Sequence, residues 1–121
     1  MSPKDLVTFV ADHVQSWQPQ LAQLVRASAP GSVHATTVRT SRRPEPWDPG
    51  LVTLIGDAVH PMIPAGIGAA VALADAARLA QELGPEIRGE TPLPTAVGQY
   101  EQAMRQYGFD AVEASEQRLQ S

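Results

Sequence analysis

The chain has 121 residues, with 9 Lys and Arg against 13 Asp and Glu, which gives a formal net charge of −4. This acidic balance argues against nucleic acid as the main partner, because nucleic-acid-binding domains carry clustered basic residues. The absence of cysteine excludes a disulfide framework, a thiolate metal site and a cysteine nucleophile. We see no signal-peptide pattern and no apolar run near the ~20 residues that cross a bilayer. We therefore expect a cytoplasmic protein without a membrane partner.

The first 31 residues are predicted to be helical. Ser2 suits an N-cap, Pro3 suits the first turn, and Asp5 favours the positive end of the helix dipole. Pro19 interrupts this helix, and a second short helix is expected to follow it. The first helix carries an apolar and aromatic face with helical spacing, formed by Leu6, Phe9, Val10, His13, Val14 and Trp17. We expect the Trp17 ring to be a core or loop anchor.

Two extended segments are predicted in the next part of the chain. Residues 33–40 alternate and are β-branched, which is typical of a strand. Residues 42–50 form a loop with three prolines around Trp47, a second expected anchor. Residues 51–55, Leu-Val-Thr-Leu-Ile, are apolar on both faces, as in a strand inside a parallel sheet. Two strands cannot bury both faces, so either further strands come from another chain or the core is rearranged.

Two helices are predicted in the remainder, at about 66–83 and 95–119, with a loop rich in glycine and proline at 84–94. Asp75, Arg78 and Glu82 share one face of the first of these helices and are expected to form a solvated stripe. The second carries an apolar stripe of Val97, Tyr100, Met104, Tyr107 and Ala111. The predicted fold class is a helix-rich α/β fragment. It is expected to be one incomplete domain over 1–121, composed of 1–31, 32–50, 51–84 and 95–119.

The polar residues after 51–55 suggest a ligand site. Asp57 follows the predicted strand, where a carboxylate either accepts hydrogen bonds from sugar or ribityl hydroxyls or only caps a turn. Gly66 and Gly68 begin the next helix and would let backbone amides approach an anionic or carbonyl-rich group, although a G-x-G pattern alone is weak. His60 has no partners at metal-ligand spacing and is expected to be a packing or hydrogen-bonding residue. We therefore assign no metal ligand and no catalytic residue.

The run Gly56-Asp-Ala-Val-His-Pro-Met-Ile-Pro64, followed by glycines and by Ala72-Leu-Ala-Asp-Ala76, resembles a known motif. It is similar to the second FAD-binding motif of flavin-dependent aromatic monooxygenases of the para-hydroxybenzoate hydroxylase type, and the likeness covers about 32–115. The resemblance implies part of a Rossmann-like FAD-binding fold. It implies that Asp57 bonds the ribityl chain, that 61–64 lies near the isoalloxazine, and that 66–68 faces its pyrimidine edge. The implied cofactor-binding residues are Gly56, Asp57, Pro61, Pro64, Gly66, Ile67, Gly68 and Ala69.

Two departures from the family pattern qualify this interpretation. The chain lacks the G-x-G-x-x-G unit that holds the FAD pyrophosphate, and Ala70 stands where the family has an asparagine. We expect the C-terminal FAD-binding segment of a monooxygenase that uses NAD(P)H and O2 to hydroxylate or epoxidise an aromatic or polyketide-like small molecule. It would be inactive alone, and its expected partner is an N-terminal flavoprotein half or further copies of itself. The alternative is a non-catalytic remnant that acts as an interaction or self-associating module.

Overall fold

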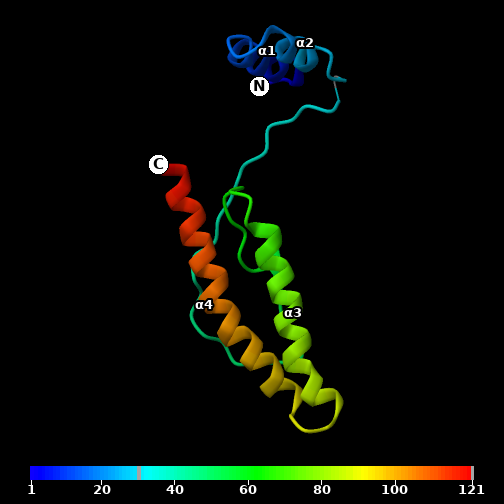
Figure 1. Cartoon of the computed structure of the whole chain (residues 1–121), viewed down its shortest axis with the longest axis vertical. Helices are drawn as coiled ribbons and strands as arrows, with labels where there is room; N and C mark the ends of the chain where they lie inside the picture. The colour runs from blue at the N-terminus through cyan, green and yellow to red at the C-terminus, as the bar shows by residue number, and fades with distance from the viewer. Residues whose placement is uncertain (30, 121) are drawn as a thin grey trace. The chain divides into compact units, whose positions relative to one another are not determined.

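The structure, a computed structural model, describes residues 1–29 and 31–120 and divides the chain into two compact units (Figure 1). The N-terminal unit is Met1–Thr37 and the C-terminal unit is Val38–Ser121. The described residues form four α-helices and one short 3-10 helix. None of the described helices combines the length and the apolar character needed to span a membrane.

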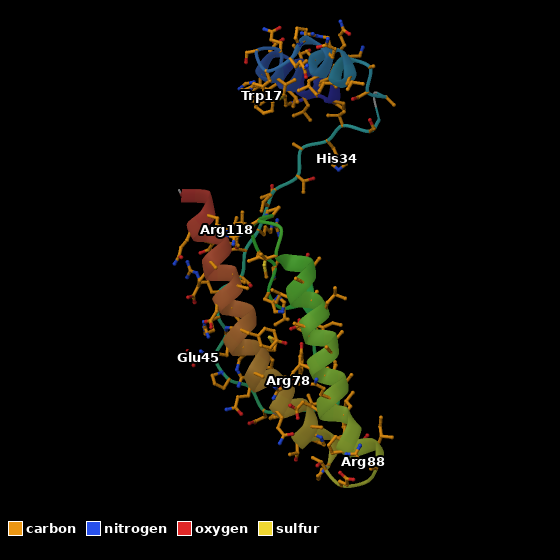
Figure 2. The ribbon with its side chains drawn as sticks, in the orientation of Figure 1. Trp17, His34, Glu45, Arg78, Arg88 and Arg118 are labelled. Carbon is orange, nitrogen blue, oxygen red and sulfur yellow. The ribbon has the colours of Figure 1, made fainter. Side chains whose placement is uncertain are left out.

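The N-terminal unit is a pair of helices that begin where the sequence predicts. Helix α1, Pro3–Val14, starts with a capping box, in which the Ser2 hydroxyl accepts from the Asp5 amide at 3.2 Å. The Asp5 carboxylate accepts in return from the Ser2 amide at 2.9 Å and from the Ser2 hydroxyl at 2.8 Å, and these two bonds to the carboxylate hold the pKa of Asp5 below its ordinary value. Helix α2, Pro19–Arg26, begins at its proline. Trp17 is 75% exposed at the surface of this unit (Figure 2), so the expectation that it is a packed anchor is wrong.

The C-terminal unit is built on two antiparallel helices, α3 (Gly68–Ile87) and α4 (Leu93–Gln120), which pack along each other (Figure 1). The predicted stripe of α4 is confirmed, because Val97, Tyr100 and Met104 are buried and Tyr107 and Ala111 pack against the core. The buried core consists of Met62, Tyr100, Met104, Phe109 and Val112. Trp47 packs against this core, and the Arg105 guanidinium lies over its ring at 5.0 Å from the centroid. Trp47 is therefore a loop anchor, as predicted.

Helix α3 is longer than its sequence pattern indicates. It continues through Gly84 and Pro85 to Ile87, so the predicted loop at 84–94 is wrong over its first part. A residue before proline normally avoids the helical region, because its Cβ and amide clash with the proline ring. Gly84 has no Cβ, which relieves part of this clash. Pro85 also lies in the last turn, where its missing amide costs the helix a single hydrogen bond.

The prediction of an α/β fold is wrong, because the described residues contain no strand and no sheet. Residues 33–40 and 51–55 make no backbone–backbone hydrogen bonds to other described segments. Ile55 has extended dihedrals, φ −132° and ψ 154°, so the local preference for extended backbone is present at this residue. A strand also requires a neighbour that accepts and donates ladder hydrogen bonds. The apolar pattern detects the extended preference but cannot supply that neighbour.

Candidate functional site

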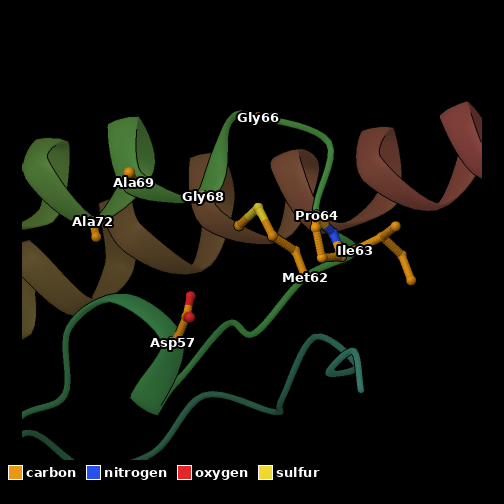
Figure 3. Close-up of a pocket in the computed structure, with 8 residues that line it drawn as sticks. All are labelled: Asp57, Met62, Ile63, Pro64, Gly66, Gly68, Ala69 and Ala72. Carbon is orange, nitrogen blue, oxygen red and sulfur yellow. The ribbon is translucent and has the colours of Figure 1, made fainter. Parts of the chain in front are cut away.

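A hollow of about 440 Å³ opens beside the short helix η1, Gly56–Ala58 (Figure 3). The loop that follows η1 and the first turns of α3 form its other walls. Five of the eight predicted cofactor-binding residues line it, namely Asp57, Pro64, Gly66, Gly68 and Ala69. We refer to this hollow as the η1–α3 pocket. Its size lies within the range of pockets that hold small ligands.

Sequence reasoning missed three lining residues, Met62, Ile63 and Ala72. Met62 and Ile63 lie inside the 61–64 stretch that the family resemblance already places near the flavin ring. Ala72 lies four residues after Gly68 on the same face of α3, so the helical period was a signal that could have found it. All three are apolar, and they form an apolar part of the pocket wall.

The other three predicted residues support the pocket from behind. Gly56 is buried, with φ +60°, and a Cβ on it would lie 3.1 Å from the Ala72 Cβ. The Pro61 carbonyl accepts a hydrogen bond from the Ser41 amide at 3.1 Å. Ile67 is the N-cap of α3 and packs against the core. These residues hold the walls in place and do not line the hollow.

The start of α3 offers unpaired amides to the pocket. Ile67 provides no side-chain cap, and its carbonyl accepts from the Val71 amide at 3.1 Å. The amides of Gly68, Ala69 and Ala70 precede that bond and therefore have no acceptor within the helix. The helix dipole adds partial positive charge at this end. Together they suit an anionic or carbonyl-rich group.

Asp57, on the wall that faces the start of α3, supplies a hydrogen-bond acceptor. Its carboxylate points into the hollow toward the first turn of α3 (Figure 3). An ionised carboxylate only accepts hydrogen bonds, so it recognises hydroxyl or amide donors. The pocket thus pairs an acceptor for hydroxyls with donors for carbonyl oxygens. A ligand that carries both a polyol chain and a carbonyl-bearing ring fits this arrangement.

Asp75 lies behind the pocket and is fully buried, so its predicted place in a solvated stripe is wrong. The other two members of that stripe, Arg78 and Glu82, do form an ion pair at 2.7 Å nearer the surface. Asp75 instead lies on the side of α3 that meets η1 and α4. Its carboxylate accepts hydrogen bonds from the Gly56 amide at 2.6 Å, His60 Nε2 at 2.7 Å and the Tyr107 hydroxyl at 2.6 Å. Helical spacing groups the three residues correctly but does not reveal what they face.

The predicted role of His60 as a hydrogen-bonding residue is confirmed. Its ring is fully buried, and its Nδ1 has no hydrogen-bond partner among the described residues. Phe109 meets the ring edge-on, with centroids 6.2 Å apart. Gly108 lets α4 pass close to the ring, since a Cβ there would lie 2.7 Å from His60 Cδ2. The fit of α4 against this loop therefore depends on a residue without a side chain.

Both tyrosines of the chain lie in this region and remain neutral at ordinary pH. Burial raises the pKa of Tyr107, and the hydrogen bond to the Asp75 carboxylate raises it further. Burial also raises the pKa of Tyr100, with a further contribution from the Asp75 charge. The Tyr100 hydroxyl donates to the Leu54 carbonyl at 2.9 Å. Two neutral phenols on α4 thus hold the Asp75 carboxylate and the backbone that leads into η1.

Comparison with known proteins shows which family the chain belongs to. A family model described as "FAD binding domain" matches residues 9–115. Among solved structures, the crystal structure of a protein assigned as an FAD-containing monooxygenase, from Photorhabdus luminescens, is 37% identical with a TM-score of 0.76. The match covers 95% of this chain but only 31% of that one. None of the curated proteins matches the chain significantly. The chain therefore belongs to the FAD-binding domain family of FAD-dependent aromatic monooxygenases.

Proposed function

We propose that the chain forms one wall of the FAD site of a flavin-dependent monooxygenase and is inactive until another segment completes that site. The observation that carries this proposal is the η1–α3 pocket, which sets the Asp57 carboxylate opposite the unpaired amides of α3. Asp57 would accept hydrogen bonds from ribityl hydroxyls. The amides of Gly68 and Ala69 would donate to the carbonyl oxygens of the flavin ring. The departure at Ala70 removes a side-chain amide from this wall but leaves its backbone donors.

FAD held against this wall would supply the redox chemistry for hydroxylation or epoxidation with NAD(P)H and O2. The residues of this chain would bind and orient the ring, with apolar side chains such as Met62 and Ile63 keeping water from it. The positive end of α3 would favour negative charge on the ring edge that it faces. We propose no acid, base or nucleophile in this chain. An aromatic or polyketide-like small molecule is the proposed substrate class, supported by family membership.

A partner segment is the second part of the proposal. The chain spans only 31% of the related solved structure, and residues 51–55 leave their apolar side chains uncovered. Val52 is 81% exposed and Leu51 is 75% exposed. Unpaired extended backbone with apolar side chains is a typical site for pairing with another segment. We propose that an N-terminal flavoprotein segment, which carries the pyrophosphate-binding glycines, covers 51–55.

A non-catalytic, self-associating module is the second candidate, and the same observation favours it. If further copies of this chain covered Leu51 and Val52, the apolar surface would be buried without any flavin chemistry. The two candidates differ in what accompanies burial of this surface. The first requires FAD binding, and the second requires only an oligomer.

FAD titration of the purified chain, by quenching of flavin fluorescence with light scattering in parallel, tests the proposal. We expect saturable binding, alone or with the N-terminal segment added, that Asp57→Ala weakens by about tenfold or more, as for a lost hydrogen bond to a charged group. Asp48→Ala is the matched control, because it removes an exposed carboxylate that does not line the pocket. An oligomer that binds no FAD up to millimolar concentration, with or without that segment, would support the self-associating module instead.

A further inference from the structure

We propose that the buried Asp75 carboxylate is a positioning residue that fixes the Gly56–Asp57 turn and so aims Asp57 into the η1–α3 pocket. This inference rests on the proposed function, because it assigns a task to the residue behind the proposed cofactor wall. Asp75 does not line the pocket and is not a catalytic residue. It acts on Asp57 through the backbone of Gly56, whose amide it binds.

The Asp75 carboxylate joins three segments that are distant in the sequence. Its Oδ2 accepts from the Gly56 amide of η1 and from His60 Nε2 in the loop that follows. Its Oδ1 accepts from the Tyr107 hydroxyl of α4. Hydrogen bonds to a charged acceptor are short and strong, and the three distances of 2.6, 2.7 and 2.6 Å agree with this. Asp75 thus ties α3, the η1 loop and α4 at one point.

Both backbone groups of Gly56, its amide and its carbonyl, form hydrogen bonds. Its amide donates to Asp75, and its carbonyl accepts from the Val59 amide at 3.0 Å and the His60 amide at 3.1 Å. Its φ of +60° lies in the left-handed region, which most residues avoid. With both backbone groups bound, the turn has little freedom, while the side chain of Asp57 next to it stays exposed. The carboxylate of Asp57 therefore takes its direction from a backbone that Asp75 fixes.

Packing alone does not explain a carboxylate at position 75. The helix pair is held by the apolar core around Tyr100 and Met104, and Leu79 of α3 packs against that core. An apolar side chain at position 75 would avoid the desolvation that burial of a charge requires. Such a side chain could not accept the hydrogen bond from the Gly56 amide. A side chain with an acceptor oxygen is needed here if the task is to hold that amide as well as the ring of His60.

The test uses the full chain with Asp75→Ala, Asp75→Asn and the matched control Leu79→Ala. Leu79→Ala weakens the same helix but leaves the Gly56 hydrogen bond intact. Asparagine can place its oxygen toward Gly56 and His60 and its amide toward the Tyr107 oxygen, so it should rescue the turn. The readouts are the chemical shift and hydrogen exchange of the Gly56 amide by NMR, the FAD affinity, and the melting temperature.

In the unaltered chain we expect a downfield, slowly exchanging Gly56 amide. Asp75→Ala should lose both signatures and weaken FAD binding by about tenfold or more. Asp75→Asn should keep the protected amide and stay within about threefold of the unaltered affinity. Leu79→Ala should lower the melting temperature without moving the Gly56 amide or the affinity. The inference is overturned if Asp75→Ala leaves the Gly56 amide unchanged, or if Leu79→Ala changes amide and affinity as much as Asp75→Ala does.

Two further results keep the test decisive. If the unaltered chain binds no FAD even with the N-terminal segment, the proposed function fails, and the Gly56 amide alone decides whether Asp75 fixes the turn.

If Asp75→Ala does not fold, Tyr107→Phe removes a single donor and leaves the core ring in place. We then expect a faster-exchanging Gly56 amide and weaker FAD binding than in Leu79→Ala. An unchanged Gly56 amide in Tyr107→Phe would overturn the inference.

Discussion

The two units of the chain are held together in different ways. In the N-terminal unit, side-chain hydrogen bonds join residues close in sequence, and the longest among its described residues links Arg26 to Asp12, 14 residues apart. In the C-terminal unit, Tyr100 reaches 46 residues back to the Leu54 carbonyl. There Arg43 reaches 67 residues forward to Asp110, with Glu113 beside it.

This difference determines where a binding site can form. The N-terminal unit buries small residues such as Ala11 and Ala22 and leaves large ones exposed. The C-terminal unit buries long side chains from α4 against the loop that carries Asp57. Long-range bonds of this kind hold an irregular loop in one geometry, which a ligand site requires. Local helix signals alone make helices but do not position a pocket.

The largest expected effect comes from comparing the truncation of one large apolar side chain in each unit. Met104→Ala removes a fully buried side chain from the helix pair and should lower the unfolding free energy by roughly 2–5 kcal/mol. Leu24→Ala removes a side chain of similar size that is 69% exposed on α2, and it should change stability by at most about 0.5 kcal/mol. Urea unfolding followed by circular dichroism measures both. Equal losses would mean that the units do not differ in how they are held.

Two glycines, one in each unit, extend the comparison to the backbone. Gly56→Ala forces a side chain onto φ +60° and toward the Ala72 Cβ, and it should cost roughly 1–3 kcal/mol. Gly31→Ala in the N-terminal unit meets no atom within 4 Å and has no positive φ, so it should be neutral or slightly stabilising. Thermal unfolding of the two variants tests this. A destabilising Gly31→Ala of similar size would show that glycine is required at both places.

Within α3, Leu79→Ala and Gln81→Ala compare the two faces of one helix. Leu79 packs against the core although it is only partly buried, so its truncation should cost about 1–3 kcal/mol. Gln81 is exposed, and its truncation should cost several times less. Chemical denaturation gives both values. A Gln81→Ala loss that matches that of Leu79→Ala would mean that the helix presents a different face to α4.

The features that sequence alone predicts here are those set by neighbouring residues. The N-cap at Ser2 and the apolar stripe of α4 follow from spacing within one helix, and both are confirmed. Family resemblance points to the loop around Asp57, and five of its eight residues line the pocket. Whether these residues contact FAD stays a prediction.

The features that the sequence misses depend on partners elsewhere. Residues 51–55 have the composition of a buried strand, but the described chain offers no neighbour to pair with them. Asp75 looks like a surface residue because Arg78 and Glu82 share its helical face. Its burial follows from the Gly56 amide and the Tyr107 hydroxyl, 19 and 32 residues away, which no local pattern brings together.

The smallest expected effect is a dependence of stability on alkaline pH, confined to the C-terminal unit, which holds both tyrosines of the chain. The folded state raises the pKa of Tyr107, chiefly by burial, above the value of about 10 in the unfolded chain. Above that pH the unfolded state binds fewer protons than the folded state, so the unfolding free energy falls as pH rises. Below it this contribution is fully present and independent of pH. Tyr107→Phe should therefore reduce the slope of stability between about pH 10 and 11 and leave the slope near pH 7 unchanged. Urea titrations across this range measure the slope, and an identical alkaline slope in both proteins would mean that Tyr107 is not held neutral by the fold.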